Sequence, residues 1–552
     1  MIENPIISGC NPDPSILRVG DAYYVATSTF EWFPGIPIYK SYDLEHWELV
    51  NHALTKVSQA DLKGMDSATG VWAPALSYCE ATKDFYITYS IVLGFNNNNF
   101  DIDNYAVVAK DIEGEFSDAI YLNSSGFDPS MFHDEDGRSY LVSLQWEFRV
   151  GYEHPGVIIV QEYDKSSKTL IGEPSVISKG ATDRGCAEGP HIYKRNGYYY
   201  LIIAEGGTGY GHCITISRAT NVFGPYIPYE FNPIITSQPN DFNERGIGDS
   251  AKPWQYSEGY YLQKSGHGSI VETPYGETFI THLCSRPFVP ELRSVLGRET
   301  SIQACEWTED GWIKLKGDDN IAKQFISKPN IPDEIKNQAI KDIRIANSGL
   351  DEFDNKVLAN NYYTLREQFS EDWCSINEDN TLRLVGRNTL FSKYKQSIVA
   401  RKVKDFNYTA STRMKIEDLN HLQLSGLTLY YNHNNFYALH VYYSERLGGR
   451  AIGILKGDNG KRIEYREDSI LLPSTIDWID LKLKVEGRNM QFYYATSPNK
   501  WIAIGPVLDT TILSDEYAGG FTGTFVGVFA WDLYQKSKIF TFDNFSYIDK
   551  TY

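Results

Sequence analysis

The sequence lacks the features of several common classes of protein. Its seven cysteines are odd in number and scattered, with no Cys-x-x-Cys pair, so they indicate neither a disulfide framework nor a zinc site. No apolar run approaches the length of a membrane span, and the first residues lack the basic and apolar regions of a secretory signal. We therefore expect a cytoplasmic protein with reduced, mostly buried thiols.

Sequence motifs of several enzyme classes are missing as well. Residues 206–211 (Gly-Gly-Thr-Gly-Tyr-Gly) have neither the Gly-x-Gly-x-x-Gly spacing nor the Gly-Lys-Ser/Thr ending of phosphate loops. Residues 101–104 (Asp-Ile-Asp-Asn) lack the Gly and Glu of a calcium loop. There is no His-Glu-x-x-His helix motif and no Gly-x-Ser-x-Gly elbow. The chemistry must come from another arrangement of residues.

Positive charge is also scarce. Lys and Arg number 52 against 71 Asp and Glu, which gives a net charge of −19 and a pI near 5.1. Nucleic acid and anionic membranes are therefore poor partners. Aromatic residues, in contrast, make up 14% of the chain. This composition suits β-strands and supplies flat faces on which sugar rings can stack.

A five-fold repeat organises the first half of the chain. Each unit has a short segment with a Pro or Gly, then a polar turn, then an aromatic strand, and its first segments are 13–16, 73–76, 128–131, 189–192 and 268–271. Five such units predict a five-bladed β-propeller, in which the first strand of every blade lines the central axis. Asp13 and Asp128 directly precede the prolines of units one and three, and Glu188 lies one residue earlier relative to the Pro of unit four, so the three acids should converge there.

The pattern changes beyond the propeller, which we place at 1–316. Residues 317–350 mix Asp, Asn, Lys and Pro without periodicity and predict a linker, with room for a short helix. After them, strands alternate apolar and polar residues, as in 479–485 (Ile-Asp-Leu-Lys-Leu-Lys-Val). This alternation predicts half-buried antiparallel strands and a β-sandwich over 351–552. The fold class is therefore all-β.

The three converging acids suggest a reaction. A single Asp before a Pro is commonly structural, because it can cap a turn. Three acids at equivalent positions around one axis repel one another, which costs stability unless they are paired or functional. Glycoside hydrolysis needs two carboxyl groups on opposite sides of the scissile bond. A third carboxylate nearby would raise the pKa of the acid.

Four motifs in order resemble the β-xylosidases of glycoside hydrolase family 43. They are Asn-Pro-Asp-Pro-Ser at 11–15, Gly-Phe-Asp-Pro-Ser at 126–130, Ala-Glu-Gly-Pro-His-Ile-Tyr-Lys at 187–194 and Leu-Gly-Arg-Glu-Thr at 296–300. The resemblance spans the whole chain and implies a five-bladed propeller followed by a concanavalin-like sandwich. It agrees with the fold expected from the repeat and the alternation.

The resemblance also implies roles for particular residues. Asp13 would be the general base, Glu188 the general acid, and Asp128 the residue that orients Glu188 and tunes its pKa. Arg298 would hold sugar hydroxyls, and His267 would lie near the axis and the sugar. No cofactor is required. Some relatives hold a divalent cation in the central channel, so a cation near His267 is an open option that no ligand cluster in the sequence indicates.

Walls of the sugar site follow from the same resemblance. Phe30 and Trp72 occupy positions that line the subsite for the non-reducing end, and Thr208 lies in a loop expected beside the acid. Phe525 resembles a sandwich residue that reaches over and closes the pocket. The sandwich would then be a wall of the site. The competing interpretations make it an independent carbohydrate-binding module or a stabilising domain.

We expect an exo-acting, inverting β-D-xylosidase that releases xylose from the non-reducing ends of xylo-oligosaccharides, with α-L-arabinofuranosidase side activity. Two alternatives stay open. One is a sugar-binding propeller without catalysis, which the intact acid triad opposes; the other is a glycoside phosphorylase, which the lack of a basic cluster opposes. The resemblance also predicts a homo-oligomer, either a dimer or a tetramer.

Overall fold

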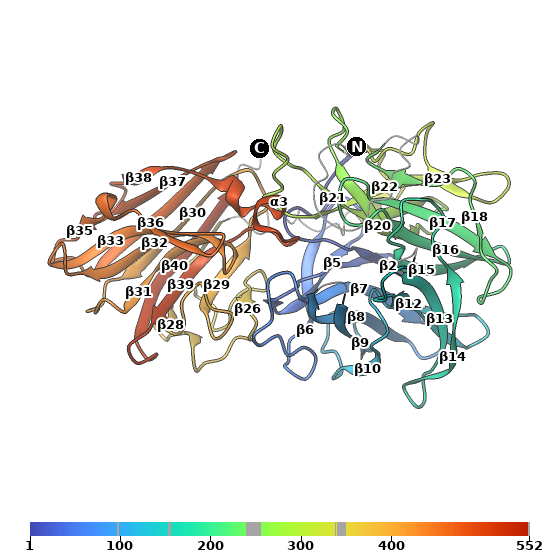
Figure 1. The fold of residues 1–552 in the computed structure, drawn as a ribbon, viewed down its shortest axis with the longest axis horizontal. Helices are drawn as coiled ribbons and strands as arrows, with labels where there is room; N and C mark the ends of the chain where they lie inside the picture. Colours follow the sequence, from blue (N-terminus) through green and yellow to red (C-terminus); the bar gives the residue numbers. More distant parts are fainter. Residues whose placement is uncertain (97–98, 153–155, 239–255, 337, 339–348, 550–552) are drawn as a thin grey trace.

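The computed structural model describes residues 1–96, 99–152, 156–238, 256–336, 338 and 349–549. The chain forms two bodies side by side, one from the N-terminal residues at the right of Figure 1 and one from the C-terminal residues at the left. Within these residues, no helix has both the length and the apolar character needed to cross a membrane.

The N-terminal body consists of five antiparallel sheets, each built from one stretch of the chain. Blade one contains β2 (Ser15–Val19), β3 (Ala22–Ala26), β5 (Gly35–Ser41) and β6 (Glu48–Leu54). Blade two contains β7 (Gly70–Cys79), β8 (Asp84–Asn96), β9 (Asn99–Ala109) and β10 (Ile120–Asn123). Blade three contains β11 (Ser130–His133), β12 (Ser139–Trp146), β13 (Gly156–Asp164) and β14 (Thr169–Ser178).

The remaining two blades follow the same order. Blade four contains β15 (Glu188–Arg195), β16 (Tyr198–Glu205), β17 (Cys213–Ala219), β18 (Ile227–Pro228) and β19 (Ile235–Thr236). Blade five contains β20 (Gln263–Glu272), β21 (Thr278–Ser285), β22 (Glu299–Trp307) and β23 (Ile313–Leu315). The first strands β2, β7, β11, β15 and β20 contact one another in succession, and β20 contacts β2. This closed ring is the axis of a five-bladed propeller, as the repeat predicts.

The N-terminal residues help to close the ring. β1 (Ile2–Glu3) pairs with β24 (Phe325–Ile326), so part of the predicted linker docks on the propeller. The Asn4 side chain donates a hydrogen bond to the carbonyl of Ile302 in blade five, at 2.7 Å. The short helix expected in the linker is α1 (Asp333–Lys336). The last two linker residues already belong to a strand, β25 (Gly349–Asp351).

The C-terminal body is a sandwich of two sheets. One sheet contains β25, β27 (Cys374–Ile376), β28 (Leu382–Val385), β30 (Asn407–Lys415), β36 (Trp478–Glu486), β37 (Asn489–Ala495), β38 (Ile502–Asp509) and β40 (Ile539–Asp549). The other contains β29 (Ser397–Lys402), β31 (Gln423–Asn432), β32 (Asn435–Ser444), β33 (Gly449–Asp458), β34 (Lys461–Glu464), β35 (Ile470–Leu471) and β39 (Phe525–Asp532). Short helices η2 (Arg466–Asp468), η3 (Thr510–Leu513) and α3 (Asp515–Ala518) lie between strands.

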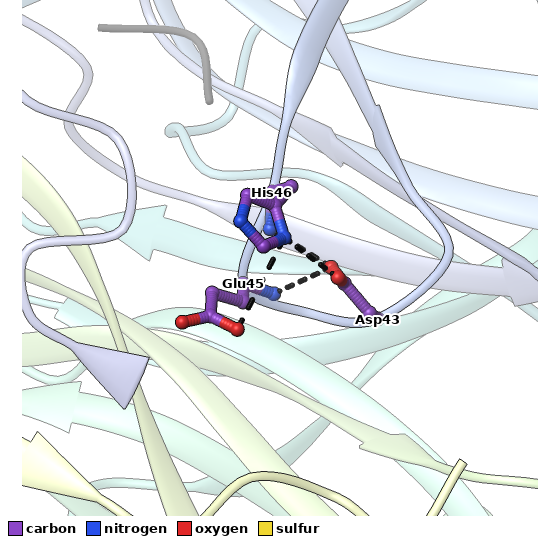
Figure 2. A group of neighbouring side chains, drawn as sticks. All are labelled: Asp43, Glu45 and His46. Atoms are coloured by element: carbon purple, nitrogen blue, oxygen red, sulfur yellow. Dashed lines mark hydrogen bonds and ion pairs between the residues drawn. The ribbon is translucent and has the colours of Figure 1, made fainter. Parts of the chain in front are cut away.

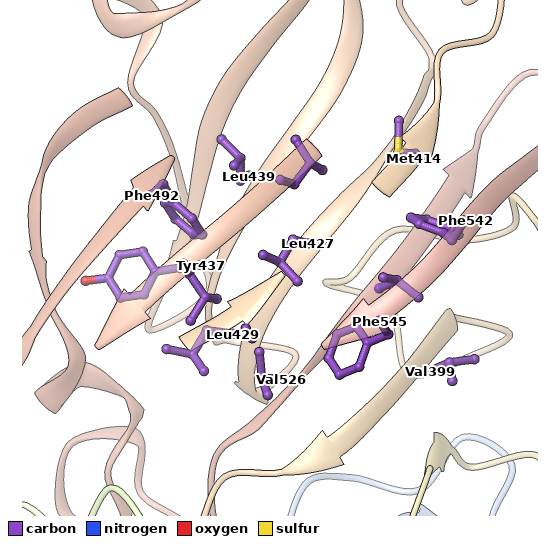
Figure 3. Packing of buried hydrophobic residues seen from close by; sticks show 14 of the residues in the cluster. Val399, Met414, Leu427, Leu429, Tyr437, Leu439, Phe492, Val526, Phe542 and Phe545 are labelled. Atoms are coloured by element: carbon purple, nitrogen blue, oxygen red, sulfur yellow. The ribbon is translucent and has the colours of Figure 1, made fainter. Parts of the chain in front are cut away.

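The alternation seen in the sequence produces the sandwich core. In β36, Ile479, Leu481, Leu483 and Val485 are buried, whereas the residues between them are partly exposed. Figure 3 shows part of the cluster that the two sheets enclose, with side chains from both. Each such aliphatic or aromatic side chain contributes about 1.5–3 kcal/mol when it is removed from water. The predicted fold class, a propeller followed by a sandwich, is confirmed.

The two bodies are joined by backbone pairing and by packing. β26 (Thr364–Leu365) pairs with β4 (Trp32–Phe33), so a sandwich-side strand extends a strand of the propeller. One buried apolar cluster contains residues from both bodies, including Phe30 and Phe525. The sandwich is therefore packed against the propeller near the mouth where the predicted site residues lie.

Candidate active site

One backbone feature recurs in all five blades. The residue before the recurring Pro or Gly at each inner strand has a positive φ, between 40° and 57°; these residues are Asp13, Ala73, Asp128, Gly189 and His267. For a residue with a side chain this conformation costs about 1–3 kcal/mol and persists only where the surroundings enforce it. The shared left-handed turn places three functional side chains, from blades one, three and five, at one pocket.

Asp13 is buried, and both of its carboxylate oxygens have partners. Ser28 donates from its hydroxyl to Oδ2 at 2.6 Å, and Arg298 donates from Nη1 to Oδ1 at 3.2 Å. His267 Nδ1 lies 3.8 Å from Oδ1. The hydroxyl and the guanidinium fix the orientation of the carboxylate, which a base that activates water requires.

Arg298 connects this carboxylate to the sandwich. Its Nη2 donates to the backbone carbonyl of Phe521 at 3.1 Å, and the guanidinium lies 5.1 Å from the centre of the Phe521 ring. Its Nε is buried and has no hydrogen-bond partner within the described part of the chain. A buried donor without a partner is costly, so a sugar hydroxyl is a fitting acceptor.

Asp128 and Glu188 form the acid side of the pocket. Asp128 Oδ2 accepts a hydrogen bond from the backbone N–H of Gly189 at 2.9 Å, directly beside Glu188. Burial raises the pKa of Asp128 well above its ordinary value, and the negative charges of Glu188 and Asp13 add to this rise. Negative charges this close together disfavour ionisation, so Asp128 keeps its proton to higher pH than an ordinary aspartate.

Gly189 is required for this arrangement. A Cβ added there would lie 3.0 Å from ring atoms of His267, and its φ is +57°. A side chain would therefore displace His267 or the backbone that Asp128 holds. The motif Glu-Gly-Pro thus positions the acid through the backbone.

Aromatic side chains enclose the pocket, which has a volume of about 450 Å³. Phe30, Trp72 and Phe521 pack edge to face, with ring centres 5.5 Å apart for Phe30 and Phe521 and 5.3 Å for Trp72 and Phe521. Thr208 also lines the pocket, in the loop predicted beside the acid. These rings give the pocket an aromatic wall, which suits contact with a sugar ring.

The prediction for Phe525 was wrong. Phe525 is buried in the interface, where it stacks on Trp32 with ring centres 3.7 Å apart, and it does not line the pocket. The sandwich residue that lines the pocket is Phe521, four residues earlier. Phe525 is the first residue of strand β39, so its side chain faces the core, whereas Phe521 lies in the loop before it. The position of Phe521 in a Gly-rich loop, outside a strand, was the signal in the sequence that could have identified it as the pocket residue.

Two further aromatic residues of the pocket are not among those predicted from the sequence. Phe127 and Trp146 line the pocket, and Trp72 packs edge to face against Phe127 at 5.8 Å. Phe127 precedes Asp128 in a motif that the sequence does show, so its adjacency to the acid was the usable signal. Trp146 ends an aromatic strand, and strand aromatics are more often core residues.

The residues around His267 fit a cation poorly. Burial lowers the pKa of His267, which favours a neutral ring. The carboxylate next to it is Asp13, whose oxygens are held by Ser28 and Arg298. A cation would have to compete with that guanidinium, so these residues do not favour the divalent cation that the resemblance left as an option near His267.

A different group meets the distance criterion for a metal among the residues that the structure describes. The ligand atoms of Asp43, Glu45 and His46 all lie within 4.8 Å of one another. Figure 2 shows the three side chains grouped around one turn. Their contacts are those of a turn between β5 and β6. Asp43 accepts from the backbone N–H of His46 at 2.8 Å, and its other oxygen is 2.7 Å from the His46 ring. The group stabilises the turn and does not include His267.

The fold and the pocket together define a class of protein: a carbohydrate-cleaving propeller with three acids at the mouth of its axis. The chain matches the family "Glycosyl hydrolases family 43" over residues 2–313 and the "Beta xylosidase C-terminal Concanavalin A-like domain" over 350–548. It belongs to glycoside hydrolase family 43 and is a glycoside hydrolase.

Relatives match over nearly the full length. Xylosidase/arabinosidase 43B of Humicola insolens is 39% identical, over 99% of this chain and 97% of that protein. A beta-xylosidase of Bacillus subtilis strain 168 is 39% identical over 96% of each. The crystal structure of a xylan beta-1,4-xylosidase from Bacillus halodurans C-125 has a TM-score of 0.92 and 40% identity, with all of both chains covered.

Proposed function

We propose that the protein is an exo-acting, inverting β-D-xylosidase that removes xylose from the non-reducing ends of xylo-oligosaccharides, with α-L-arabinofuranosidase side activity. The observation that carries this proposal is the pocket itself. It is lined by aromatic rings and holds Asp13 and Glu188, from different blades, on its walls. The names of the relatives support xylose as the sugar.

The reaction needs one base and one acid. Asp13 takes a proton from a water molecule, which attacks the anomeric carbon of the terminal xylose. Glu188 gives its proton to the departing glycosidic oxygen, so the bond breaks as the new one forms. Inverting enzymes hold these two carboxyl groups roughly 6.5–9.5 Å apart, which leaves room for the water. We expect the same separation here.

Asp128 serves the acid without touching the bond that breaks. It fixes the backbone beside Glu188 through Gly189, and its negative charge would favour the protonated form of that acid. Arg298 orients the base and offers its Nε to a sugar hydroxyl. We expect the aromatic wall of Phe30, Trp72 and Phe521 to limit the pocket to the terminal sugar, which is what exo action requires.

The roles of acid and base can be separated by changing the leaving group. For Glu188→Ala, turnover of xylobiose should fall by about 10²–10⁴, the usual contribution of positioned proton transfer. An aryl xyloside with an acidic phenol should be much less affected, because that phenolate departs without a proton. Asp13→Ala should slow both substrates alike, since water must be activated in either case.

The opposite pattern would reverse the two roles, and unchanged turnover in both variants would make the acids structural. NMR of the first product should show α-xylose from a β-xyloside. Rates measured with and without phosphate provide the control for phosphorolysis: a rate that needs phosphate would contradict hydrolysis.

A further inference from the structure

Two completely buried serines, Ser28 and Ser90, occupy equivalent positions in blades one and two. Ser28 follows β3 and Ser90 lies in β8, the second strands of their blades. Each serine lies two residues beyond the strand partner of the residue that follows the inner-strand Pro. In blades three, four and five the same position holds residues without a hydroxyl: Leu144, Ala204 and Leu283.

Each of the two hydroxyls accepts a hydrogen bond from the next blade. The backbone N–H of Ala73 donates to Oγ of Ser28 at 2.7 Å, and the backbone N–H of Asp128 donates to Oγ of Ser90 at 3.1 Å. Ala73 and Asp128 are the residues with positive φ at the entries of blades two and three, and both line the pocket. The serines therefore hold two of the strained turns that carry pocket residues.

The two serines differ in the group to which they donate their own proton. Ser28 donates to Oδ2 of Asp13 at 2.6 Å, whereas Ser90 donates to the side-chain oxygen of Asn104 at 2.8 Å. A hydroxyl has one proton, and the N–H of Ala73 can only donate, so the direction of both hydrogen bonds at Ser28 is fixed. Oδ2 of Asp13 is therefore always a hydrogen-bond acceptor.

The surroundings of Asp13 distinguish its two oxygens. Ser28 is not among the described residues that line the pocket, so Oδ2 faces the interior of the protein. Oδ1 lies 3.2 Å from Nη1 of Arg298 and 3.8 Å from Nδ1 of His267, and both of these residues line the pocket. Oδ1 is therefore the oxygen on the side of the substrate.

We propose that Ser28 is a positioning residue for the base: it holds Oδ2 of Asp13 as an acceptor, so that Oδ1 takes the proton of the attacking water. The proton of the water goes to Oδ1, and the electron pair of the broken O–H bond stays on the oxygen that attacks the anomeric carbon. This assignment rests on the proposed function, in which Asp13 is the base. It predicts that Ser28 acts on catalysis only through Asp13.

The equivalent serine provides a matched control. Ser28→Ala and Ser90→Ala each remove a hydrogen bond to the N–H of the next blade, but only Ser28→Ala takes a donor from the base. For Ser28→Ala, kcat/KM should fall by about 12- to 160-fold for xylobiose and for an aryl xyloside alike, because a hydrogen bond to a charged group contributes roughly 1.5–3 kcal/mol. Any loss in Ser90→Ala, which affects Asp128, should be larger for xylobiose.

The acidic limb of the pH–rate profile tests the role in orienting the base. The groups beside Asp13 that carry charge or titrate are Arg298 and His267 of blade five and Asp128 of blade three, and neither serine substitution removes them. Loss of the donor disfavours the ionised base. The acidic limb should therefore move to higher pH by about one unit in Ser28→Ala and stay in place in Ser90→Ala.

A double-mutant cycle separates positioning from a general loss of structure. Adding Ser28→Ala to Asp13→Ala should slow the aryl xyloside by no more than about 2-fold further, because the residue through which Ser28 acts is already gone. Ser28→Cys, which keeps a weak donor of similar size, should lie between Ser28→Ala and the unmodified enzyme. Denaturant unfolding of each variant measures any loss of stability separately.

The outcomes that contradict the proposal are distinct from a failure of the proposed function. An acidic limb that stays in place in Ser28→Ala, or that moves equally in Ser90→Ala, would overturn the positioning role. A further loss in the double variant as large as that in Ser28→Ala alone would overturn it as well. If instead the unmodified enzyme cleaves no aryl β-xyloside, the proposed function fails.

Discussion

Replacement of Phe521 should lower catalytic activity, whereas replacement of Phe525 should lower the stability of the fold, although both residues belong to one short segment of the sandwich. Phe521→Ala removes an aromatic wall of the pocket, which packs edge to face against Phe30 and Trp72. Loss of one aromatic contact with the sugar, worth about 0.5–1.5 kcal/mol, should lower kcat/KM by roughly 2- to 12-fold. Phe521→Leu, which keeps apolar bulk, should lose less.

Phe525→Ala should instead destabilise the fold. The side chain is 1% exposed and stacks on Trp32, so its loss should cost about 3–5 kcal/mol. Kinetics on an aryl xyloside and denaturant unfolding of the same samples separate the effects. The assignment is refuted if Phe521→Ala retains full kcat/KM, or if Phe525→Ala lowers kcat while unfolding at the wild-type denaturant concentration.

Two further predictions concern protons. Asp128→Asn removes a negative charge beside Glu188, so the pKa of the acid should fall and the alkaline limb of the pH–rate profile should move to lower pH. If that limb does not move, Asp128 does not set the pKa of the acid. Burial lowers the pKa of Lys402 to about 8 from 10.5, so the unfolded chain binds the proton more tightly than the fold. Its contribution to stability should rise between pH 8 and 10.5. Lys402→Met should therefore raise the free energy of unfolding most below pH 8, by up to about 3 kcal/mol, and less as the pH approaches 10.5. Urea unfolding at several pH values measures this difference. A stabilisation that is the same at every pH would contradict the lowered pKa of Lys402.

The propeller and its acids could be predicted from the sequence because the signal is local and repeated. Every blade begins with the same short motif, so equivalent positions meet at the axis by topology alone. Glu188 is one residue out of register with Asp13 and Asp128, and the structure explains the offset. The left-handed residue of blade four is Gly189, and the acid precedes it.

The walls of the pocket could not be predicted in the same way. Phe521 reaches the pocket from a loop, and its place depends on how two domains pack, which no local pattern encodes. Ser28 holds the base through one hydrogen bond, and a lone serine carries no sequence signal. The docking of β24 on β1 likewise joins residues more than 300 positions apart. Such contacts follow from tertiary packing and not from periodicity.

The loop that carries Phe521 is anchored to the propeller by a buried ion pair. Lys264 of blade five and Glu516 of α3 lie 2.7 Å apart, with side chains 4% and 2% exposed, and α3 lies between the two bodies in Figure 1. The backbone N–H of Ser294 also donates a hydrogen bond to the Glu516 carboxylate, at 2.7 Å. Removing one partner of a buried pair costs about 3–5 kcal/mol, so the loop is held firmly in one position.

This anchor couples domain packing to catalysis. Arg298 donates to Asp13 through Nη1 and to the Phe521 carbonyl through Nη2, so the same guanidinium orients the base and binds the sandwich loop. Gly297 lies directly against that loop, because a Cβ there would lie 1.8 Å from the carbonyl oxygen of Thr522. A sandwich that only bound carbohydrate independently would need no such contact. We therefore predict that docking of the sandwich and the orientation of Asp13 are coupled through Arg298.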